Sequence, residues 1–555
     1  MKKIKLLLII ALTAVISIVS FNFTDGYFEH SKNIDIFTTL YGKLNVYYVD
    51  DTEPGKLMKT GIDAMLKSLD PYTVYYPESD IEDYRFMTTG QYGGIGSLIT
   101  KKDSFVVISE PYEGFAAQKG GLMAGDVILE VDGKSTLNKT TSELSKILKG
   151  EPGTMLVMKI QRPGTEGLLT KEIVREEVTL DAVPYFGMLE NNIGYIKLNS
   201  FTETASRDVK TAFNTLKDSL GMETLIFDLR GNGGGLLVEA VEIVNIFVPK
   251  GQEVVTTKGK ITDWNKTYNT RNSPLDTEIP LIVLIDPYSA SASEIVSGTL
   301  QDLDRAVIIG QNSFGKGLVQ QTMPLSYNSK LKVTVAKYYT PSGRCIQRLD
   351  YTDKDEKGKA KEVADSSMTQ FETINGRPVF DGAGIKPDLE VKVNELPKII
   401  GSLLQNTIFF DYATIYRLSH DSILPAKLFS LSDEEYNEFV SYTKSKDFEH
   451  ETQTERILDG LKEVAENEKC TEATMKQIQL LEKQLATEKD NDIIKHKKEL
   501  ELILRNEIVS RYYYQTGRIE TNLSSDDEIK KALKVLSDTS MYSSILKGTF
   551  EPVAK

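Results

Sequence analysis

The sequence predicts a mixed α/β protein with a helical C-terminal region. Residues 185–395 alternate continuous apolar segments with helix patterns, as in a sheet covered by helices on both faces. Residues 92–178 carry short strand patterns and one helix pattern, which indicates a smaller β-rich domain. Residues 396–555 are mostly helical in pattern and highly charged. Residues 27–85 predict short helices with apolar positions at Ile36, Leu40, Leu44, Leu57, Ile62, Met65 and Leu66, ending in the turn LDPYTVYY.

Composition places the chain among ordinary globular proteins. Its 555 residues are 40% apolar and 26% charged, and this length suits about three to four domains. The net charge of −14 argues against nucleic acid as a general partner, because phosphate binding requires a basic face. Cys345 and Cys470 are too few for a disulfide framework, and neither lies in a metal-ligand spacing.

The N-terminal residues indicate export. Three lysines precede an apolar run at residues 6–21, and polar sequence follows. The run is long for a signal peptide core and short for a membrane-spanning helix, so a cleaved signal and a retained anchor are both open. We expect residues 1–24 to direct the chain to the periplasm or cell envelope, with membrane association through this segment where it is retained.

Two glycine-bearing segments of the β-rich region point to a peptide-binding module. In QYGGIGSLI, the N–H groups of Gly93, Gly94, Ile95 and Gly96 precede a strand and suit an anion-binding nest. The segment EGFAAQKGGLMAGDVILEVDGKST follows and contains a Gly-Leu-x-x-Gly-Asp-x-Ile core. Together they resemble a PDZ domain, over about residues 85–180. The resemblance implies that the glycine-rich loop receives a peptide's terminal carboxylate while the peptide adds as an edge strand.

Periodicity predicts which side chains of this region form its core. VILEV alternates, so Val127, Leu129 and Val131 are expected to face inward before an Asp-Gly turn. TSELSKILKG predicts a short amphipathic helix that ends at its glycine. The apolar face of that helix comprises Leu144, Ile147 and Leu148.

The α/β region carries a serine at a strand-to-helix junction. IGYIKL, TLIFDL, IPLIVLID and RAVIIG predict its strands, with helices at 204–219, 236–247 and 291–303. In SASASE, Ser291 and Glu294 form a Ser-x-x-Glu capping box that starts the last of these helices. The helix dipole favours negative charge at that point, which suits a nucleophile. An N-cap without a catalytic role is the alternative.

A serine nucleophile needs a base, and the usual base is absent from this region. The chain's histidines lie outside residues 31–419: His30, His420, His450 and His496. Lys316 follows the next predicted strand, between Gly315 and Gly317. Burial disfavours the charged form of lysine and makes a desolvated lysine a working base. Gln320, four residues on, shares a face with Lys316 in a helix or a strand, so its amide is placed to orient the lysine.

Two further glycine-rich segments allow other chemistry. Gly310, Gly315 and Lys316 fit the P-loop spacing, but Gly317 replaces the magnesium-binding Ser or Thr, and the following LVQQTMPL is extended in pattern. A nucleotide site is therefore not expected. TLIFDLRGNGGG offers N–H groups for a phosphate or an oxyanion, or forms a plain tight turn. The sequence has no H-E-x-x-H motif, and its four scattered histidines make no ligand set, so a metalloprotease is excluded. No metal or cofactor is expected.

The motifs GGIG, DLRGNGGG, SASASEI, FGKGLVQ and YYTPSGRCIQ, with the PDZ core, resemble the carboxy-terminal processing peptidases, also called tail-specific proteases. The resemblance covers about residues 69–388. It implies a crotonase-like α/β protease core with an inserted PDZ domain, which captures substrate C-termini and gates the active site. It also implies Ser291 as nucleophile, Lys316 as base and Gln320 as the residue that orients the lysine.

The resemblance implies the remaining site residues as well. The oxyanion donors correspond to the backbone amide of Ala292, the residue after the serine, and to that of Gly234 in the glycine-rich turn. The family often has proline at the second position of this turn, where this chain has Gly233. Ser289 and Ser293 are then turn and helix-start residues. The implied substrates are poorly folded or precursor proteins with apolar free C-termini. The rival interpretation, a catalytically silent PDZ peptide-binding protein, is disfavoured because serine, lysine and glutamine are all present.

The predicted organisation has five segments. They are a signal peptide or anchor (1–24), an N-terminal helical segment (25–84), the PDZ domain (85–180), the protease core (181–395) and a C-terminal helical domain (396–555). In the last, Ser432 and Glu435 form a capping box. A stripe of Met475, Ile478, Leu481 and Leu485 predicts a helix-packing or self-association face. By analogy with other exported proteases, this domain is expected to mediate assembly or adaptor docking.

Overall fold

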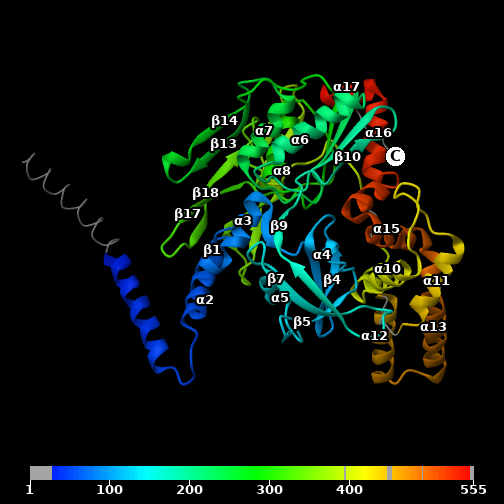
Figure 1. The fold of residues 1–555 in the computed structure, drawn as a ribbon. Helices are drawn as coiled ribbons and strands as arrows, with labels where there is room; N and C mark the ends of the chain where they lie inside the picture. Colours follow the sequence, from blue (N-terminus) through cyan, green and yellow to red (C-terminus); the bar gives the residue numbers. More distant parts are fainter. Residues whose placement is uncertain (1–27, 393–395, 447–452, 491, 551–555) are drawn as a thin grey trace, which may run out of the picture. The chain divides into compact units, whose positions relative to one another are not determined.

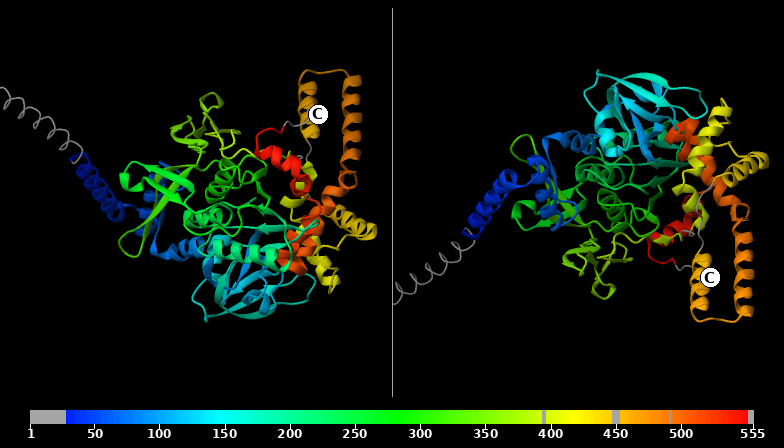
Figure 2. Two further views of the ribbon diagram at one scale, coloured as in Figure 1. Left: turned by 90° about the horizontal axis from the view of Figure 1, so that it is seen from above. Right: turned by 90° about the horizontal axis from the view of Figure 1, so that it is seen from below.

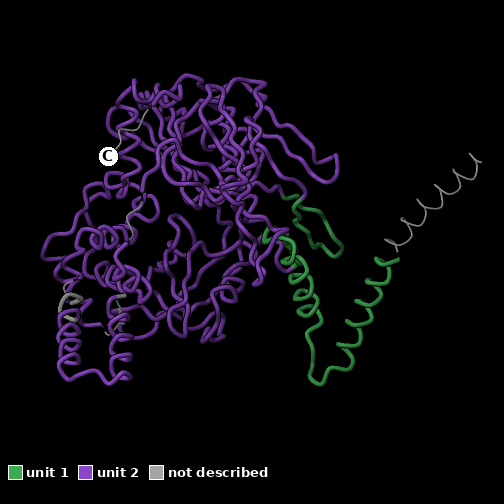
Figure 3. The backbone as a smooth tube through the Cα atoms, turned by 180° about the vertical axis from the view of Figure 1, so that it is seen from behind, with its two compact units in different colours: residues 1–78, 320–334 green, residues 79–319, 335–555 purple. Residues whose placement is uncertain are grey.

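The computed structural model describes residues 28–392, 396–446, 453–490 and 492–550. The chain divides into two compact units, one of residues 1–78 and 320–334 and one of residues 79–319 and 335–555 (Figure 3). The predicted signal or anchor at residues 1–24 lies outside the described residues. Within those residues, no helix has both the length and the apolar character that crossing a membrane requires.

The first unit contains N-terminal helices and a short β-pairing. A helix at residues 28–47 is followed by α2 (Pro54–Lys67) and β1 (Val74–Tyr76). β1 pairs antiparallel with residues 330–332 of β18 (Lys330–Tyr339), and β17 (Leu318–Pro324) also pairs with β18. The predicted turn is present, because Asp70 Oδ1 accepts the N–H groups of Tyr72 and Thr73, both at 2.8 Å. Of the predicted apolar positions, Leu66 is buried, whereas Ile36, Leu40, Leu44, Leu57 and Met65 are exposed.

A six-stranded sheet forms the centre of the second unit, in the order β10-β11-β12-β15-β16-β23. All neighbours are parallel except β10 and β11. The strands are β10 (Tyr185–Met188), β11 (Ile193–Lys197), β12 (Thr224–Asp228), β15 (Leu281–Ile285), β16 (Val307–Gly310) and β23 (Leu389–Glu390). Their near-continuous apolar sequences are typical of strands buried on both faces, and all five residues of β15 are buried.

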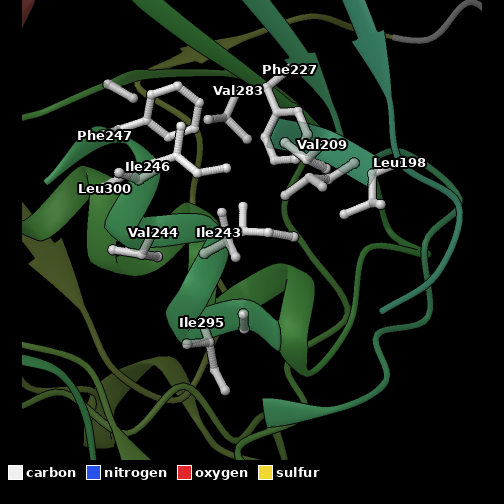
Figure 4. Close-up of a cluster of buried hydrophobic side chains, with 14 of the residues drawn as sticks. Leu198, Val209, Phe227, Ile243, Val244, Ile246, Phe247, Val283, Ile295 and Leu300 are labelled. Atoms are coloured by element: carbon white, nitrogen blue, oxygen red, sulfur yellow. The ribbon is translucent and has the colours of Figure 1, made fainter. Parts of the chain in front are cut away.

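Helices cover both faces of this sheet, as the sequence predicts. One face packs against α6 (Ala205–Asn214), α7 (Leu237–Phe247) and α8 (Ala292–Asp302), where Phe227 and Val283 of the sheet meet Ile243 of α7 (Figure 4). The other face packs against α16 (Asp527–Ser537) and α17 (Thr539–Leu546), through residues such as Ile529 and Val535 (Figures 1 and 2). The helices on the second face therefore come from the last part of the chain.

The smaller β-rich domain lies within residues 91–179. Its main sheet runs β3-β4-β5-β7-β8, with β6 beside β5, while β2 pairs separately with β9. Its elements are β2 (Gln91–Gly94), β3 (Ser97–Lys102), β4 (Phe105–Pro111), α4 (Ala116–Lys119), β5 (Val127–Val131), β6 (Lys134–Ser135), α5 (Thr141–Leu148), β7 (Met155–Gln161), β8 (Leu169–Val174) and β9 (Glu176–Thr179), preceded by α3 (Ile81–Thr89). β3 is an edge strand of this sheet.

The predicted inward alternation of β5 is partly wrong. Ile128 and Val131 are buried, whereas Val127 and Leu129 are partly exposed. The pairing of β5 with β7 shifts register between Ile128 and Glu130, and such a bulge turns the following side chains to the opposite face. The helix α5 agrees with its prediction, since Leu144 and Leu148 are buried and Ile147 packs beside them.

The region after residue 396 is helical, as predicted. Besides α16 and α17 it contains α9 (Lys398–Gln405), α10 (Ile408–Ser419), α11 (Asp433–Lys444), α12 (Gln453–Asn467), α13 (Glu472–Asp490), α14 (Asp492–Lys495) and α15 (Lys497–Asn522). The predicted capping box of Ser432 and Glu435 starts α11. The predicted stripe on α13 packs against α12 through Met475, Ile478 and Leu485, while Leu481 is 43% exposed. The two helices lie side by side (Figure 2).

Shorter strands complete the second unit. β13 (Glu253–Gly259) pairs with β14 (Lys266–Asn269) and with residues 336–339 of β18. Two hairpins follow, formed by β19 (Leu349–Lys354) with β20 (Ala360–Glu362) and by β21 (Gln370–Glu372) with β22 (Pro378–Phe380).

Candidate active site

Ser291 lies at a strained turn between β15 and α8. Its backbone has φ 57° and ψ −111°, a region that a residue with a Cβ rarely adopts. Strain of this kind costs about 1 to 3 kcal/mol and persists where the surroundings enforce it, often at functional sites. Here the Tyr338 hydroxyl donates to Ser291 O at 3.2 Å. The Ser291 residue stays partly exposed at the start of the helix.

The two neighbouring serines are used in structural hydrogen bonds. Ser289 Oγ donates to Leu229 O at 2.9 Å, and Ser293 Oγ donates to Asn232 O at 2.9 Å. Both serines are completely buried. They therefore act as turn and helix-start residues, as the family resemblance implies, and Ser291 is the accessible serine of the three.

Glu294 joins the main chains on which Ser291 and Lys316 lie. Its Oε2 accepts the Ser291 N–H at 2.8 Å and the Lys316 N–H at 2.9 Å. Its Oε1 accepts the Gly315 N–H at 2.7 Å and the Ser313 hydroxyl. Burial raises the pKa of Glu294 even though these hydrogen bonds favour the carboxylate. One buried side chain thus fixes the predicted nucleophile and base relative to each other.

Sequence reasoning identified Glu294 as a capping residue and missed this second role. The capping interaction itself is present, since Glu294 accepts the Ser291 N–H. Glu294 is the one ionisable side chain between Ser291 and Asp302 of α8, and every residue of α8 is buried. A charged residue in so apolar a helix is rarely buried without partners, and this was the available signal.

Lys316 lies in an extended segment between β16 and β17. No helix follows the segment, in agreement with the predicted extended pattern. Phe314 N–H donates to Ser289 O at 3.0 Å, which holds the segment against the serine-bearing turn. A Cβ on Gly315, at φ 86°, would lie 2.5 Å from Arg348 Cβ, and one on Gly317 would lie 2.9 Å from Gln347 N. The flanking glycines therefore permit a close approach of the neighbouring chain, which a side chain at either position would prevent.

Gln320 belongs to β17 in the first unit, where side chains hold its amide. Its Nε2 donates to Thr334 Oγ1 at 3.2 Å. The Thr334 N–H donates in turn to Thr73 Oγ1 at 3.3 Å, and the Thr73 hydroxyl donates to Asp70 at 3.1 Å. The turn LDPYT is thereby tied to the strand that carries Gln320. The predicted action of Gln320 on Lys316 stays a prediction.

The glycine-rich turn after β12 lies against Ser291. A Cβ on Gly234, at φ 99°, would lie 2.9 Å from Ser291 Cβ and 3.0 Å from Ala292 N. Ala292 is the first residue of α8, so its N–H precedes the first intrahelical hydrogen bond. The Gly234 N–H donates to Asn232 Oδ1 at 2.8 Å, and its predicted role as an oxyanion donor stays a prediction.

Asn232 shapes this turn, and sequence reasoning did not single it out. Asn232 is completely buried, and its Nδ2 donates to Leu198 O at 2.9 Å. Its main-chain carbonyl accepts the N–H of Ala290, the residue before Ser291, at 3.0 Å. The asparagine therefore connects the β11 end, the glycine-rich turn and the serine-bearing turn.

The four residues predicted to bind a peptide C-terminus occupy different positions. Gly93 and Gly94 belong to β2 and pair with β9. Ile95 and Gly96 form the turn into β3, where Gly96 has φ 71° and Ile95 lines a groove of about 350 Å³. The groove lies along β3 and α5, and its lining includes Tyr92, Ile95, Leu98, Ile99, Thr141 and Leu148. In the described part of the chain, no cluster of His, Cys, Asp and Glu has the arrangement of a metal site.

Three family models match the chain. Residues 192–356 match peptidase family S41, residues 107–162 match a PDZ domain, and residues 399–536 match the C-terminal helical domain of a probable PDZ-protease. The first two matches fall on the core sheet with Ser291 and on the groove-bearing domain. The third falls on the helical region and includes α16 except for its last residue.

Relatives agree with these matches. A carboxy-terminal-processing protease of Bartonella bacilliformis is 34% identical over 395 residues, which are 68% of this chain and 90% of the relative. A probable CtpA-like serine protease of Staphylococcus aureus is 34% identical over 61% of this chain and 68% of the relative. The solved structure of a photosystem II D1 C-terminal processing protease is 27% identical over 65% of this chain and 93% of that chain, with a TM-score of 0.35. The chain therefore belongs to the carboxy-terminal-processing proteases of peptidase family S41, and it is a serine-type peptidase.

Proposed function

We propose that the chain is an exported endopeptidase in which Ser291 is the nucleophile, Lys316 the general base and Gln320 the residue that orients the lysine. The observation that carries this proposal is the Glu294 carboxylate, which accepts the N–H groups of both Ser291 and Lys316 on one oxygen. A positioned base next to a serine is what nucleophilic catalysis requires, and lysine serves as that base where histidine is absent.

The reaction follows the acyl-enzyme route. Ser291 Oγ attacks the scissile carbonyl carbon while the neutral Lys316 amine takes its proton. The carbonyl oxygen becomes an oxyanion beside the Ala292 and Gly234 N–H groups, and these donors stabilise the negative charge that develops there. Lys316 then gives the proton to the leaving amine. Water hydrolyses the acyl-enzyme in a second cycle that restores Ser291.

The PDZ domain selects substrates by their C-terminal tails in this proposal. β3 is the edge strand of its sheet, so a peptide can add to it through main-chain hydrogen bonds. The adjoining groove is lined by apolar side chains of Ile95, Leu98 and Leu148. The N–H groups at the end of β2, at Gly93 and Gly94, and in the turn of Ile95 and Gly96 that follows it are proposed to receive the terminal carboxylate. Apolar tails of poorly folded or precursor proteins fit such a groove.

We also propose export to the periplasm or cell envelope. The support is the lysine-led apolar run within residues 1–24. Cell fractionation and determination of the mature N-terminus test this, because a chain that stays in the cytosol with residues 1–24 intact would contradict export. A mature chain that begins near residue 25 indicates a cleaved signal, and a full-length chain in the membrane indicates an anchor.

The helical region is proposed to mediate self-association or adaptor docking. The support is the apolar surface that α12 and α13 leave exposed, with Leu461 at 50% and Leu480 at 53%. These leucines lie on two neighbouring helices, and contiguous exposed apolar surface is typical of interaction sites. Light scattering of the mature chain and of Leu461→Glu/Leu480→Glu, with and without cell-envelope extract, tests it. Identical particle mass in all four samples would contradict the proposal.

The proposed activity is tested by cleavage of an unfolded protein with an apolar C-terminus. The mature chain is compared with Ser291→Ala, and both act on that substrate and on the same substrate with two aspartates appended. We expect cleavage by the wild type alone, slowed by the acidic tail, and unchanged by metal chelators. The rate should rise with pH as Lys316 loses its proton.

Two results would contradict these assignments. Equal cleavage by the wild type and Ser291→Ala would exclude Ser291 as nucleophile. Equal cleavage of the two substrates would exclude selection of the tail by the PDZ domain. If neither protein cleaves, the silent peptide-binding alternative is tested by titrating the tail peptide into the wild type, where binding without cleavage would favour that alternative.

A further inference from the structure

A buried charged cluster connects the glycine-rich turn with the start of α16. Arg230, two residues after β12, binds Asp228 through Nε at 3.0 Å and Nη2 at 2.6 Å. Its Nη1 donates to Asp526 Oδ2 at 2.7 Å and to the Glu528 carboxylate. Asp526 is the N-cap of α16, the helix that covers the second face of the sheet, and Glu528 lies in its first turn. The guanidinium thus spans two parts of the chain that are almost 300 residues apart.

Capping of α16 explains the position of Asp526 but not that of Glu528. Asp526 caps α16 with Oδ1, which accepts the N–H groups of Glu528 and Ile529 at 2.9 and 3.0 Å. This leaves Oδ2 for Arg230 and makes Glu528 unnecessary for capping. Glu528 is nevertheless only 9% exposed, and burial raises its pKa although Arg230 opposes that shift. Burying a carboxylate is unfavourable unless a partner compensates, so its position is tied to Arg230.

Arg230 leads directly into the oxyanion-binding turn. Gly231 N–H donates to Asp286 Oδ1 at 2.9 Å, and Asn232 follows with its bonds to Leu198 and Gly234. Two residues separate Arg230 from Gly233, so the cluster holds the chain segment that leads into the turn with the Gly234 N–H. Lys197 Nζ holds the other side of Arg230 by donating to its carbonyl.

Glu528 also touches the segment that carries Lys316. Gln311 Nε2 donates to Glu528 Oε1 at 3.5 Å. A Cβ on Gly310 would lie 3.4 Å from the same oxygen, and Gly310 ends β16. The single carboxylate of Glu528 therefore lies behind both loops of the proposed site.

We infer that Arg230 is a positioning residue for the oxyanion-binding turn and that Asp526 and Glu528 of α16 hold it in place, so the C-terminal helix contributes to the catalytic rate. This inference rests on the proposed function. Removing the Glu528 charge frees one side of the guanidinium, and the turn loses its fixed position relative to Ser291. Since the oxyanion forms in the transition state, the loss appears in kcat rather than in KM.

The test compares Glu528→Gln with the control Asp527→Asn in the mature full-length chain. Asp527 is the neighbouring residue of the same helix, and its side chain is 72% exposed beside Lys530. We expect Glu528→Gln to lower kcat by about tenfold, the effect of displacing a catalytic group by a fraction of an ångström. KM should not change, and Asp527→Asn should match the wild type. Labelling of Ser291 by a fluorophosphonate, which forms a tetrahedral adduct, should slow in parallel.

A double-mutant cycle separates positioning from loss of stability. Arg230→Lys keeps the charge but not the fork of donors, and combining it with Glu528→Gln should lower kcat no further than the stronger single change. All assays are made below the thermal unfolding midpoint of each variant, with folding checked by circular dichroism. A normal kcat in folded Glu528→Gln, a change in KM alone, or additive single effects would overturn the inference. A wild type that neither cleaves nor labels would instead overturn the proposed function.

Discussion

The two faces of the core sheet are covered by helices of different origin. On the first face, α6 and α8 lie between consecutive strands, and α7 follows β12. On the second, α16 and α17 come from the last part of the chain. The covering helices of each face contain completely or almost completely buried apolar side chains, such as Ile243 at 0% exposure and Ile529 at 1%. The start of α8 supplies the proposed nucleophile, and the start of α16 supplies the carboxylates that bind Arg230.

The end of the helical region, α16 and α17, is therefore part of the peptidase core. A helix that completes a sheet contributes to the same cooperative unit as the strands it covers. The hairpin of α12 and α13 differs, because its small cluster of buried residues is separate from the sheet. We therefore expect the last two helices to affect folding and activity more than the hairpin does.

The largest expected effect tests the equivalence of the two faces. Ile243→Ala and Ile529→Ala remove the same atoms at equally buried positions, and each should lower the unfolding free energy by about 2 to 5 kcal/mol. Urea unfolding followed by far-UV circular dichroism measures both. If α16 of Ile529→Ala unfolded in a separate transition at lower urea concentration, with the sheet still folded, the two faces would not be equivalent and α16 would be an independent module.

The second largest effect is expected for the glycine-rich turn after β12, which lies beside the start of α8. In Gly234→Ala the new Cβ meets Ala290 O at 2.7 Å and lies close to Ser291 and Ala292. We expect kcat to fall by about a hundredfold, the scale of losing one oxyanion donor. Gly233→Ala is the matched control, because no atom lies within 4 Å of its Cβ. Equal activity of the two variants would show that this turn does not contribute to catalysis.

The smallest effect concerns the charged cluster that joins the faces. Burial acts to raise the pKa of Asp228, but Arg230 and Lys197 outweigh it and leave that pKa well below its usual range. A lowered carboxyl pKa stabilises the fold above the usual aspartate pKa, and this stability is lost as the pH falls through the lowered value. Asp228→Asn should therefore lower the unfolding free energy by about 2 kcal/mol at pH 7. Chemical denaturation from pH 7 to pH 3 should show this difference narrowing below about pH 4, and a constant difference would contradict the assignment.

Local patterns predicted the strands and the helices of the first face, because each element carries its own periodicity. They also predicted the positions of Ser291, with the serines on either side of it, and of Lys316, because strand ends and glycine-rich turns can be recognised in a sequence. Periodicity failed in β5, where a bulge at Ile128 changes which side chains face inward.

Contacts between distant segments were not readable. No pattern in α16 indicates that Asp526 and Glu528 meet Arg230, because a helix start rich in acid is equally stable in solvent. The second role of Glu294 was hidden for a related reason, since its capping interaction already explains the local sequence. Both features depend on tertiary packing, which propensity does not encode.

The pairing of Ser291 with Lys316 is the central claim, and covalent labelling tests it most directly. A fluorophosphonate is reacted with the wild type, with Lys316→Met and with Ser293→Ala, and the modified residue is identified by peptide mass spectrometry. We predict that the label attaches to Ser291 in the wild type and in Ser293→Ala, and that Lys316→Met, while folded, does not react. A label on another serine, or equal labelling of Ser291 without Lys316, would contradict the account.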